Sequence, residues 1–318
     1  MVFKKLLGAF GVGGPSVDTV LSNPNTRPGL ALDGQVLVQG GDHDVTIEGI
    51  NLGLVTRVEV EGGDTEFDTT VEFQRLTVSG RFSLAAGEKR AIPFQFPVPW
   101  EAPVTDVYGQ RLHGMTMGLR TELAVARAVD KGDLDPVAVH PLPAQEAVLA
   151  ALARLGFRFK GADLEHGHIR GVPQTLPFYQ EIEYFAAPQY AHALNELELT
   201  FVASPHTVDV ILEVDKRGGL FTGGHDVFHH FQVPHAGAEH TDWAARIDGW
   251  LQQAVLPYAG GHGGPGYGHH PAGPGHHGGH HGGVGAGAAV AGVGAGLVGG
   301  YLAAEMLDDV FDGGDDEG

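Results

Sequence analysis

The sequence predicts a mainly β protein with two strand-rich domains and a low-complexity C-terminal tail. First, short segments that alternate apolar and polar residues recur between turn residues, which is typical of antiparallel sheets. Second, 318 residues are enough for two ordinary domains. Third, the composition changes after Pro257, where Gly and His dominate. We therefore expect an N-terminal domain over 1–132, a C-terminal domain over 133–257 and a tail over 258–318.

Seven segments of the first domain have a strand pattern. Residues 57–61 alternate charged and apolar side chains, as half-buried antiparallel strands do. Within 71–84 the alternation shifts by one residue near Gln74–Arg75, which predicts a β-bulge. In 91–98 the apolar residues alternate with prolines, and because proline cannot donate to a ladder we expect an edge strand. The predicted strands are 17–22, 35–39, 44–50, 56–61, 71–84, 91–98 and 118–129.

The second domain follows a Gly-, Asp- and Pro-rich link at 132–136, which we interpret as an interdomain turn. A helix is expected near 143–155, with Pro143 at its first position and Gly156 after its end. A second helix is expected near 241–254, with Thr241 as N-cap. Two tryptophans on its apolar face indicate that it is docked on the domain. The predicted strands are 157–164, 178–185, 194–202, 208–214 and 227–233.

Charge and composition exclude several function classes. The chain has 19 Lys and Arg against 39 Asp and Glu, a net charge of −20, which argues against nucleic acid and against electrostatic docking of the body on an anionic membrane. It has no cysteine, which excludes disulfides, thiolate catalysis and cysteine-ligated zinc. The N-terminal residues lack the apolar run and cleavage site of a signal peptide, so we expect a cytoplasmic protein.

The tail could bind metal, a membrane or itself. Residues 259–283 are almost all Gly and His and cannot bury enough apolar surface to fold. Imidazoles there could bind Zn²⁺, Ni²⁺ or Cu²⁺ opportunistically. Residues 283–303 repeat Gly or Ala every fourth position, which favours self-association, membrane insertion or disorder. The candidate metal ligands are His269, His270, His276, His277, His280 and His281.

No catalytic motif is present. The sequence has no nucleophile elbow, HExxH pair, Walker loop or dinucleotide fingerprint. Asp130, Asp133 and Asp135 resemble an acidic metal loop but lack the Gly and terminal Glu of an EF-hand, so we interpret them as a solvated turn. The adjacent His229 and His230 would point to opposite faces of a strand, which disfavours a chelate. We expect a non-enzymatic protein without a cofactor.

Several motifs together resemble the bacterial sporulation-control protein family, over about residues 1–255. This resemblance implies two tandem antiparallel β-sandwiches of arrestin-like architecture, joined by a short hinge near 130–136. It also implies a regulatory role without an established enzymatic activity. The matching segments are Pro-Trp-Glu at 99–101, Gly-Met-Thr-Met-Gly-Leu-Arg-Thr-Glu-Leu at 114–123, Val-Asp-Lys-Gly-Asp-Leu-Asp-Pro at 129–136, Leu-Gly-Phe at 155–157, Leu-Pro-Phe-Tyr-Gln-Glu-Ile-Glu at 176–183 and Glu-Val-Asp-Lys-Arg-Gly-Gly at 213–219.

Arrestin-like modules act through strand edges and interdomain grooves, so we expect a regulator of bacterial development or stress response that binds proteins. The expected surfaces are the 93–99 edge strand, by β-augmentation, and the groove near 100–108. An alternative is a membrane-associated envelope or stress protein that uses the amphipathic residues 3–10 and the 283–303 ridge. A further alternative is metal binding by the tail. The candidate protein-interaction residues are Phe94, Phe96, Trp100, Tyr108, Asp130 and Asp133.

Overall fold

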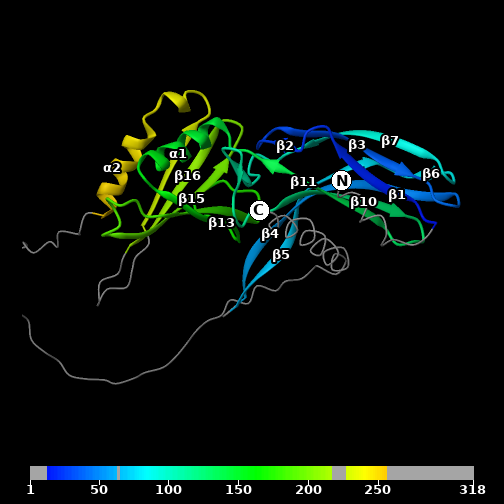
Figure 1. The fold of residues 1–318 in the computed structure, drawn as a ribbon, viewed down its shortest axis with the longest axis horizontal. Helices are drawn as coiled ribbons and strands as arrows, with labels where there is room; N and C mark the ends of the chain where they lie inside the picture. The colour runs from blue at the N-terminus through cyan, green and yellow to red at the C-terminus, as the bar shows by residue number, and fades with distance from the viewer. Residues whose placement is uncertain (1–12, 63–64, 217–226, 256–318) are drawn as a thin grey trace, which may run out of the picture.

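The computed structural model describes residues 13–62, 65–216 and 227–255 and is mainly β, with several sheets, as predicted. Two units lie side by side along the long axis of the molecule (Figure 1). We define the N-terminal unit as the elements from β1 (Ser16–Leu21) to β12 (Ala138–Val139). The C-terminal unit contains the elements from α1 (Pro143–Arg154) to α2 (Trp243–Val255). The candidate tail ligands His269 to His281, the 283–303 ridge and residues 3–10 lie outside the described residues.

The N-terminal unit is a β-sandwich. A three-stranded antiparallel sheet contains β1 (Ser16–Leu21), β3 (Ala31–Gln39) and β7 (Lys89–Pro97) in the order β1-β3-β7. The facing sheet contains β11 (Lys131–Pro136), β10 (Met117–Val125) and β4 (Val45–Gly62), with β5 (Thr65–Ser79) and β6 (Phe82–Leu84) on the other side of β4. Their core includes Leu32, Val36, Ile47, Leu52, Leu54, Phe94, Phe96, Met117, Leu119 and Leu123.

Strand β4 differs most from the sequence expectation. The segments 44–50 and 56–61 were predicted as separate strands, yet β4 runs unbroken because β10 and β5 pair with it on either side. The predicted bulge is present in β5. In the register between β4 and β5, Gln74 pairs with Leu54 and Glu72 with Val55, so Phe73 has no paired residue in β4. The Phe73 side chain packs against the cores of both units.

Strand β11 occupies the segment that was predicted to be an interdomain turn. Lys131–Pro136 pairs antiparallel with Gly118–Leu123 of β10, and the chain turns earlier, around Arg127. The predicted hinge at 130–136 is therefore corrected to a strand, because pairing with β10 overrides the turn propensity of Gly, Asp and Pro. The proposed domain limits themselves stay a prediction.

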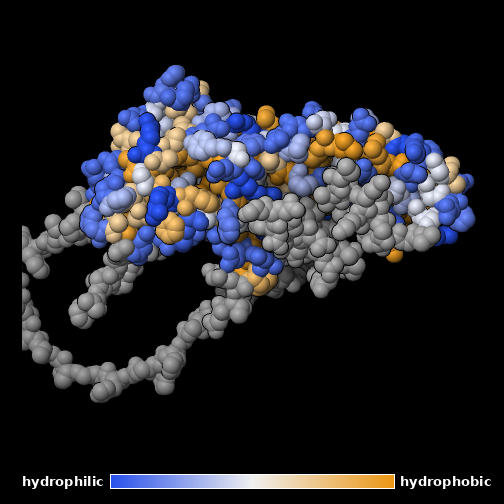
Figure 2. Space-filling view, viewed as in Figure 1, coloured by the Kyte–Doolittle hydropathy of each residue, from blue (hydrophilic) through white to orange (hydrophobic). Residues whose placement is uncertain are grey.

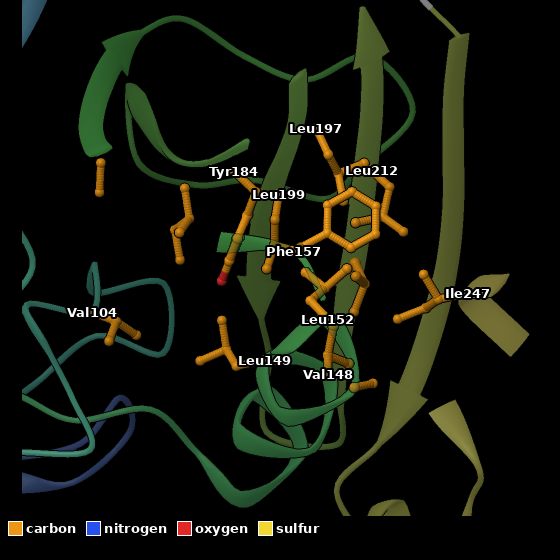
Figure 3. Close-up of a cluster of buried hydrophobic side chains, with 14 of the residues drawn as sticks. Val104, Val148, Leu149, Leu152, Phe157, Tyr184, Leu197, Leu199, Leu212 and Ile247 are labelled. Atoms are coloured by element: carbon orange, nitrogen blue, oxygen red, sulfur yellow. The ribbon is translucent and has the colours of Figure 1, made fainter. Parts of the chain in front are cut away.

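The C-terminal unit is an antiparallel sheet in the order β13-β14-β15-β16-β17, joined to β4 by the Glu165–Glu59 pair. Helices α1 (Pro143–Arg154) and α2 (Trp243–Val255) and the segment 99–116 cover its inner face. Figure 3 shows Val148, Leu149 and Leu152 of α1 facing the sheet beside Ile247 of α2. The strands are β13 (Arg158–His166), β14 (Phe178–Phe185), β15 (Leu194–Ala203), β16 (Thr207–Lys216) and β17 (Val227–Pro234).

Local signals set the helix ends. Pro143 starts α1, and the Gln145 side chain accepts a hydrogen bond from Leu142 N (2.7 Å). After the C-cap of α1, Gly156 has a φ of 88°, the left-handed conformation that glycine adopts without strain. The predicted N-cap Thr241 instead ends the short helix η2 (Ala238–His240), and Asp242 caps α2 by accepting from Ala245 N (3.2 Å). Among the described helices, none is long and apolar enough to cross a membrane.

Candidate interaction surfaces

The groove that was predicted near residues 100–108 is occupied by side chains and backbone of the protein itself. Gln180 of β14 accepts a hydrogen bond from Val104 N (2.9 Å) and donates one to Val104 O (2.7 Å), and all of these groups are buried. The Glu101 carboxylate accepts from Thr175 N (2.8 Å), Thr175 Oγ1 (2.8 Å) and Leu176 N (2.9 Å). Segment 99–116 is therefore fixed to the C-terminal unit by polar contacts. Loss of either partner of a buried contact would leave the other partner without a hydrogen bond, which destabilises the protein.

Trp100 also belongs to this junction. Its indole lies 5.5 Å from the His235 ring, and a Cβ added to Gly29 would lie 2.5 Å from the indole. The cavity that remains beside Trp100 and Gln145 has a volume of about 10 Å³. A volume of that size holds at most one water molecule. Trp100 thus joins segments of the two units, and this cavity has no room for a ligand.

Tyr108 is displayed at the junction. It follows β8 (Asp106–Val107) and precedes β9 (Gln110–Arg111), and it shares a two-residue hairpin turn with Gly109. Both turn residues have positive φ, 53° and 77°. That conformation suits Gly or Asn and is strained for a tyrosine. The side chain is 66% exposed, and burial of part of the ring, together with the Glu146 charge, raises the pKa of its hydroxyl.

Strand β7 is an edge strand, as predicted, since among the described strands only β3 pairs with it. Phe94 and Phe96, however, point into the sandwich core and are 8% and 0% exposed. They were predicted to contact a partner, but alternation places their side chains on the inner face, where a partner cannot reach them. The exposed side chains of β7 are those of its other face.

The hydrogen bonds of β7 show which backbone groups face its outer edge. Val98 N donates to Leu30 O (2.8 Å), on the side of β3. Since main-chain groups alternate along an antiparallel strand, Pro93, Gln95 and Pro97 direct theirs away from β3. Two of these three residues have no N–H, so prolines protect this edge from an added strand.

The two candidate aspartates have structural partners. Asp130 is exposed and accepts a hydrogen bond from Val125 N (3.0 Å), which closes the turn between β10 and β11. Asp133 accepts a hydrogen bond from Thr19 N (2.7 Å) and so gives a partner to a main-chain donor on the edge of β1 that faces β11. Burial, followed by the charge of nearby Asp18, raises the pKa of Asp133. The interpretation of this segment as a solvated turn holds for Asp130 and is wrong for Asp133.

Asp135 lies two positions further along the same face of β11. It is 8% exposed, and its Oδ2 is buried without a hydrogen-bond partner. Burial, and then the charges of Asp133 and Asp18, raise its pKa to about 8. A carboxyl group in these surroundings keeps its proton at neutral pH. The interpretation of Asp135 as part of a solvated turn is therefore wrong, because β1, which lies beside β11, comes from a distant part of the chain.

Carboxylates run in a row across the outer face of the C-terminal sheet. The carboxylates of Glu181, Glu198 and Glu213 lie within 4.8 Å of one another, on β14, β15 and β16. A second such group contains Glu59, Asp163 and Glu165. Burial and the neighbouring carboxylates raise the pKa of Glu181 to about 8. The sequence carried this signal, since charged residues alternate with apolar ones along these strands.

The histidines of β17 point to opposite faces, as predicted. His229 stacks on Trp250 of α2 with ring centroids 4.8 Å apart, whereas the His230 ring hydrogen-bonds Asp209 (2.7 Å). Burial, followed by the charges of His230 and Arg246, lowers the pKa of His229. His235 contacts Ser204 O (2.8 Å). These three histidines therefore have three different environments.

Figure 2 shows an apolar band over the part of the N-terminal unit that contains β3. Val20 of β1 and Leu37 of β3, 48% and 39% exposed, lie on the outer face of their sheet. Exposed apolar bands of this kind are typical of surfaces that contact other proteins.

Comparisons with known proteins agree with this architecture. A family model described as SpoOM protein matches residues 3–218. Sporulation-control protein Spo0M of Bacillus subtilis (strain 168) is 34% identical over 216 residues, which cover 68% of this chain and 81% of that protein. The crystal structure of Spo0M from Bacillus subtilis matches with a TM-score of 0.67 and 28% identity, and covers 76% of this chain and 99% of the solved chain. This chain belongs to the Spo0M family of sporulation-control proteins.

Proposed function

We propose that this protein is a non-enzymatic cytoplasmic regulator that acts by binding other proteins in a developmental or stress response. Its membership of the Spo0M family supports a role in sporulation control, because that family is one of regulators and not a known class of enzyme. The polar contacts of the junction hold the two units together. The surfaces left for function are therefore exposed side chains and strand edges.

The observation that carries the proposal is Tyr108. A tyrosine at positive φ costs about 1 kcal/mol relative to glycine. In this protein the strained Tyr108 lies at a hairpin tip, where it is 66% exposed. Exposed tyrosines are frequent anchors in protein interfaces, because a rigid ring buries a large area with few rotatable bonds. We place the partner contact at the β8–β9 hairpin.

The test replaces Tyr108 with Asn in the full chain. Asn tolerates the left-handed turn, so Tyr108→Asn removes the ring and keeps the hairpin. We expect recovery of the partner by proximity labelling in the native host to fall at least tenfold, as loss of an interface anchor of about 2 kcal/mol predicts.

Phe67→Asn is the matched control, because Phe67 is also exposed (53%) but lies on a different element, β5. Labelling of the partner should persist in that variant. The proposal is wrong if Tyr108→Asn labels the same proteins as the wild type, or if both variants lose them equally.

A further inference from the structure

The outer edge of β17 offers backbone groups for an added strand. Among the described strands only β16 pairs with β17, in an unbroken register from Val227 to Pro234. Just after β17, His235 N donates to His206 O (3.1 Å), and this bond shows which main-chain groups of the strand face β16. By alternation, Phe228, His230 and Gln232 direct their N–H and C=O groups away from β16.

This edge differs from that of β7. On β7, prolines occupy two of three successive outward positions, whereas all three such positions on β17 carry an N–H. The long edge strand β5 is irregular, because its register with β4 shifts at two places. Bulges and prolines are the usual devices that prevent strand addition. The edge of β17 has no register shift, and its one proline, Pro234, is its last residue, so three successive outward N–H groups precede that proline.

The two faces beside β17 have different chemistry. On the outer face, His230 and Gln232 hydrogen-bond Asp209 (2.7 and 2.9 Å), and Phe228 lies opposite Glu213 of the carboxylate row. On the inner face, Phe231 stacks on Trp243, with centroids 5.6 Å apart. A small cavity of about 40 Å³ lies there, lined by Leu212, His229, Phe231, Arg246, Ile247 and Trp250.

We infer that the edge of β17 binds an extended segment of a partner protein in which Lys or Arg alternates with apolar residues. The added strand would form main-chain hydrogen bonds with Phe228, His230 and Gln232. Its basic side chains would lie on the outer face, on the side of the carboxylate row that contains Glu213, and its apolar side chains beside the aromatic inner face. A second copy of this chain is a poor occupant, because each copy has a net charge of −20.

This inference deepens the proposed function and rests on it in one respect, namely that the protein binds proteins. The probe is a fluorescent heptapeptide that alternates lysine and valine, titrated with the full chain by fluorescence anisotropy. We expect it to bind at least tenfold tighter than a heptapeptide that alternates glutamate and valine. Methylation of alternate backbone nitrogens of the lysine peptide should abolish binding, and this control leaves the protein unchanged.

Two substitutions locate the site. His230→Pro and His230→Ala both lose the contact with Asp209, but only the proline removes an outward N–H. We expect at least a tenfold loss of peptide affinity in His230→Pro relative to His230→Ala, as predicted for strand addition at an edge. Glu213→Gln should reduce binding about threefold at low salt and less at high salt.

Equal affinity of the lysine and glutamate peptides, or of the two His230 variants, would overturn the inference. A concentration-dependent dimer that His230→Pro abolishes would also overturn it, because the edge would then bind a second copy. Tyr108→Asn should bind the lysine peptide as the wild type does. Failure at Tyr108 and failure at β17 are thus distinguishable.

Discussion

Gln180→Leu should lower the free energy of unfolding by about 3 kcal/mol, because it leaves both main-chain groups of Val104 buried without a partner. Leucine has a similar volume, so the loss arises from hydrogen bonding and not from a cavity. The measurement is urea unfolding of the full chain, followed by circular dichroism. Hydrogen exchange of the Val104 amide should accelerate in parallel, since segment 99–116 would be released from β14.

Gln189→Leu is the matched control. Gln189 also donates to a backbone carbonyl, that of Leu155 (2.8 Å), but this bond is exposed and water can replace it. We expect a change within about 0.5 kcal/mol for that variant. If both substitutions cost the same, the bond between Gln180 and Val104 does not stabilise the junction, and segment 99–116 is held by other contacts.

The sequence predicted those strands whose own alternation is decisive. Strand β14 has the predicted bounds 178–185, because Phe178, Gln180, Ile182 and Tyr184 share one buried face. The same row contained the signal for the junction, since Gln180 is a polar residue in an apolar row. Strand β11 was missed because Gly, Asp and Pro indicate a turn, whereas pairing with β10 decides the structure. That pairing is a tertiary effect and is not encoded within six residues.

The candidate site was predicted unevenly for the same reason. Tyr108 and Trp100 are at the junction, as the resemblance implied, but no local pattern indicates that Trp100 is covered by Gly29 and His235. Phe94 and Phe96 were predicted as contacts although their alternation with prolines already indicated an inner and an outer face. The raised pKa of Asp135 depends in part on the charge of Asp18 in β1, which lies more than a hundred residues away in the chain.

Asp135→Asn should stabilise the protein at neutral and alkaline pH and have little effect in acid. The pKa of Asp135 is about 8 in the folded protein, above the value of about 3.9 for an unfolded aspartate. Between these two pH values the folded protein holds a proton that the unfolded chain has released. Its free energy of unfolding therefore falls as the pH rises from about 4 to 8. Asparagine does not ionise, so it removes this loss.

The measurement is urea unfolding of wild type and Asp135→Asn at a series of pH values. We expect the two free energies of unfolding to agree within about 0.5 kcal/mol at pH 3.5 and to differ by about 4 kcal/mol at pH 7. Glu181 and Asp163, whose pKa values are also raised, contribute to both curves and cancel in the difference. A difference that is constant with pH would mean that Asp135 is ionised in the folded protein. The contact between β1 and β11 would then hold a buried negative charge at Asp135, which the unpartnered Oδ2 of Asp135 argues against.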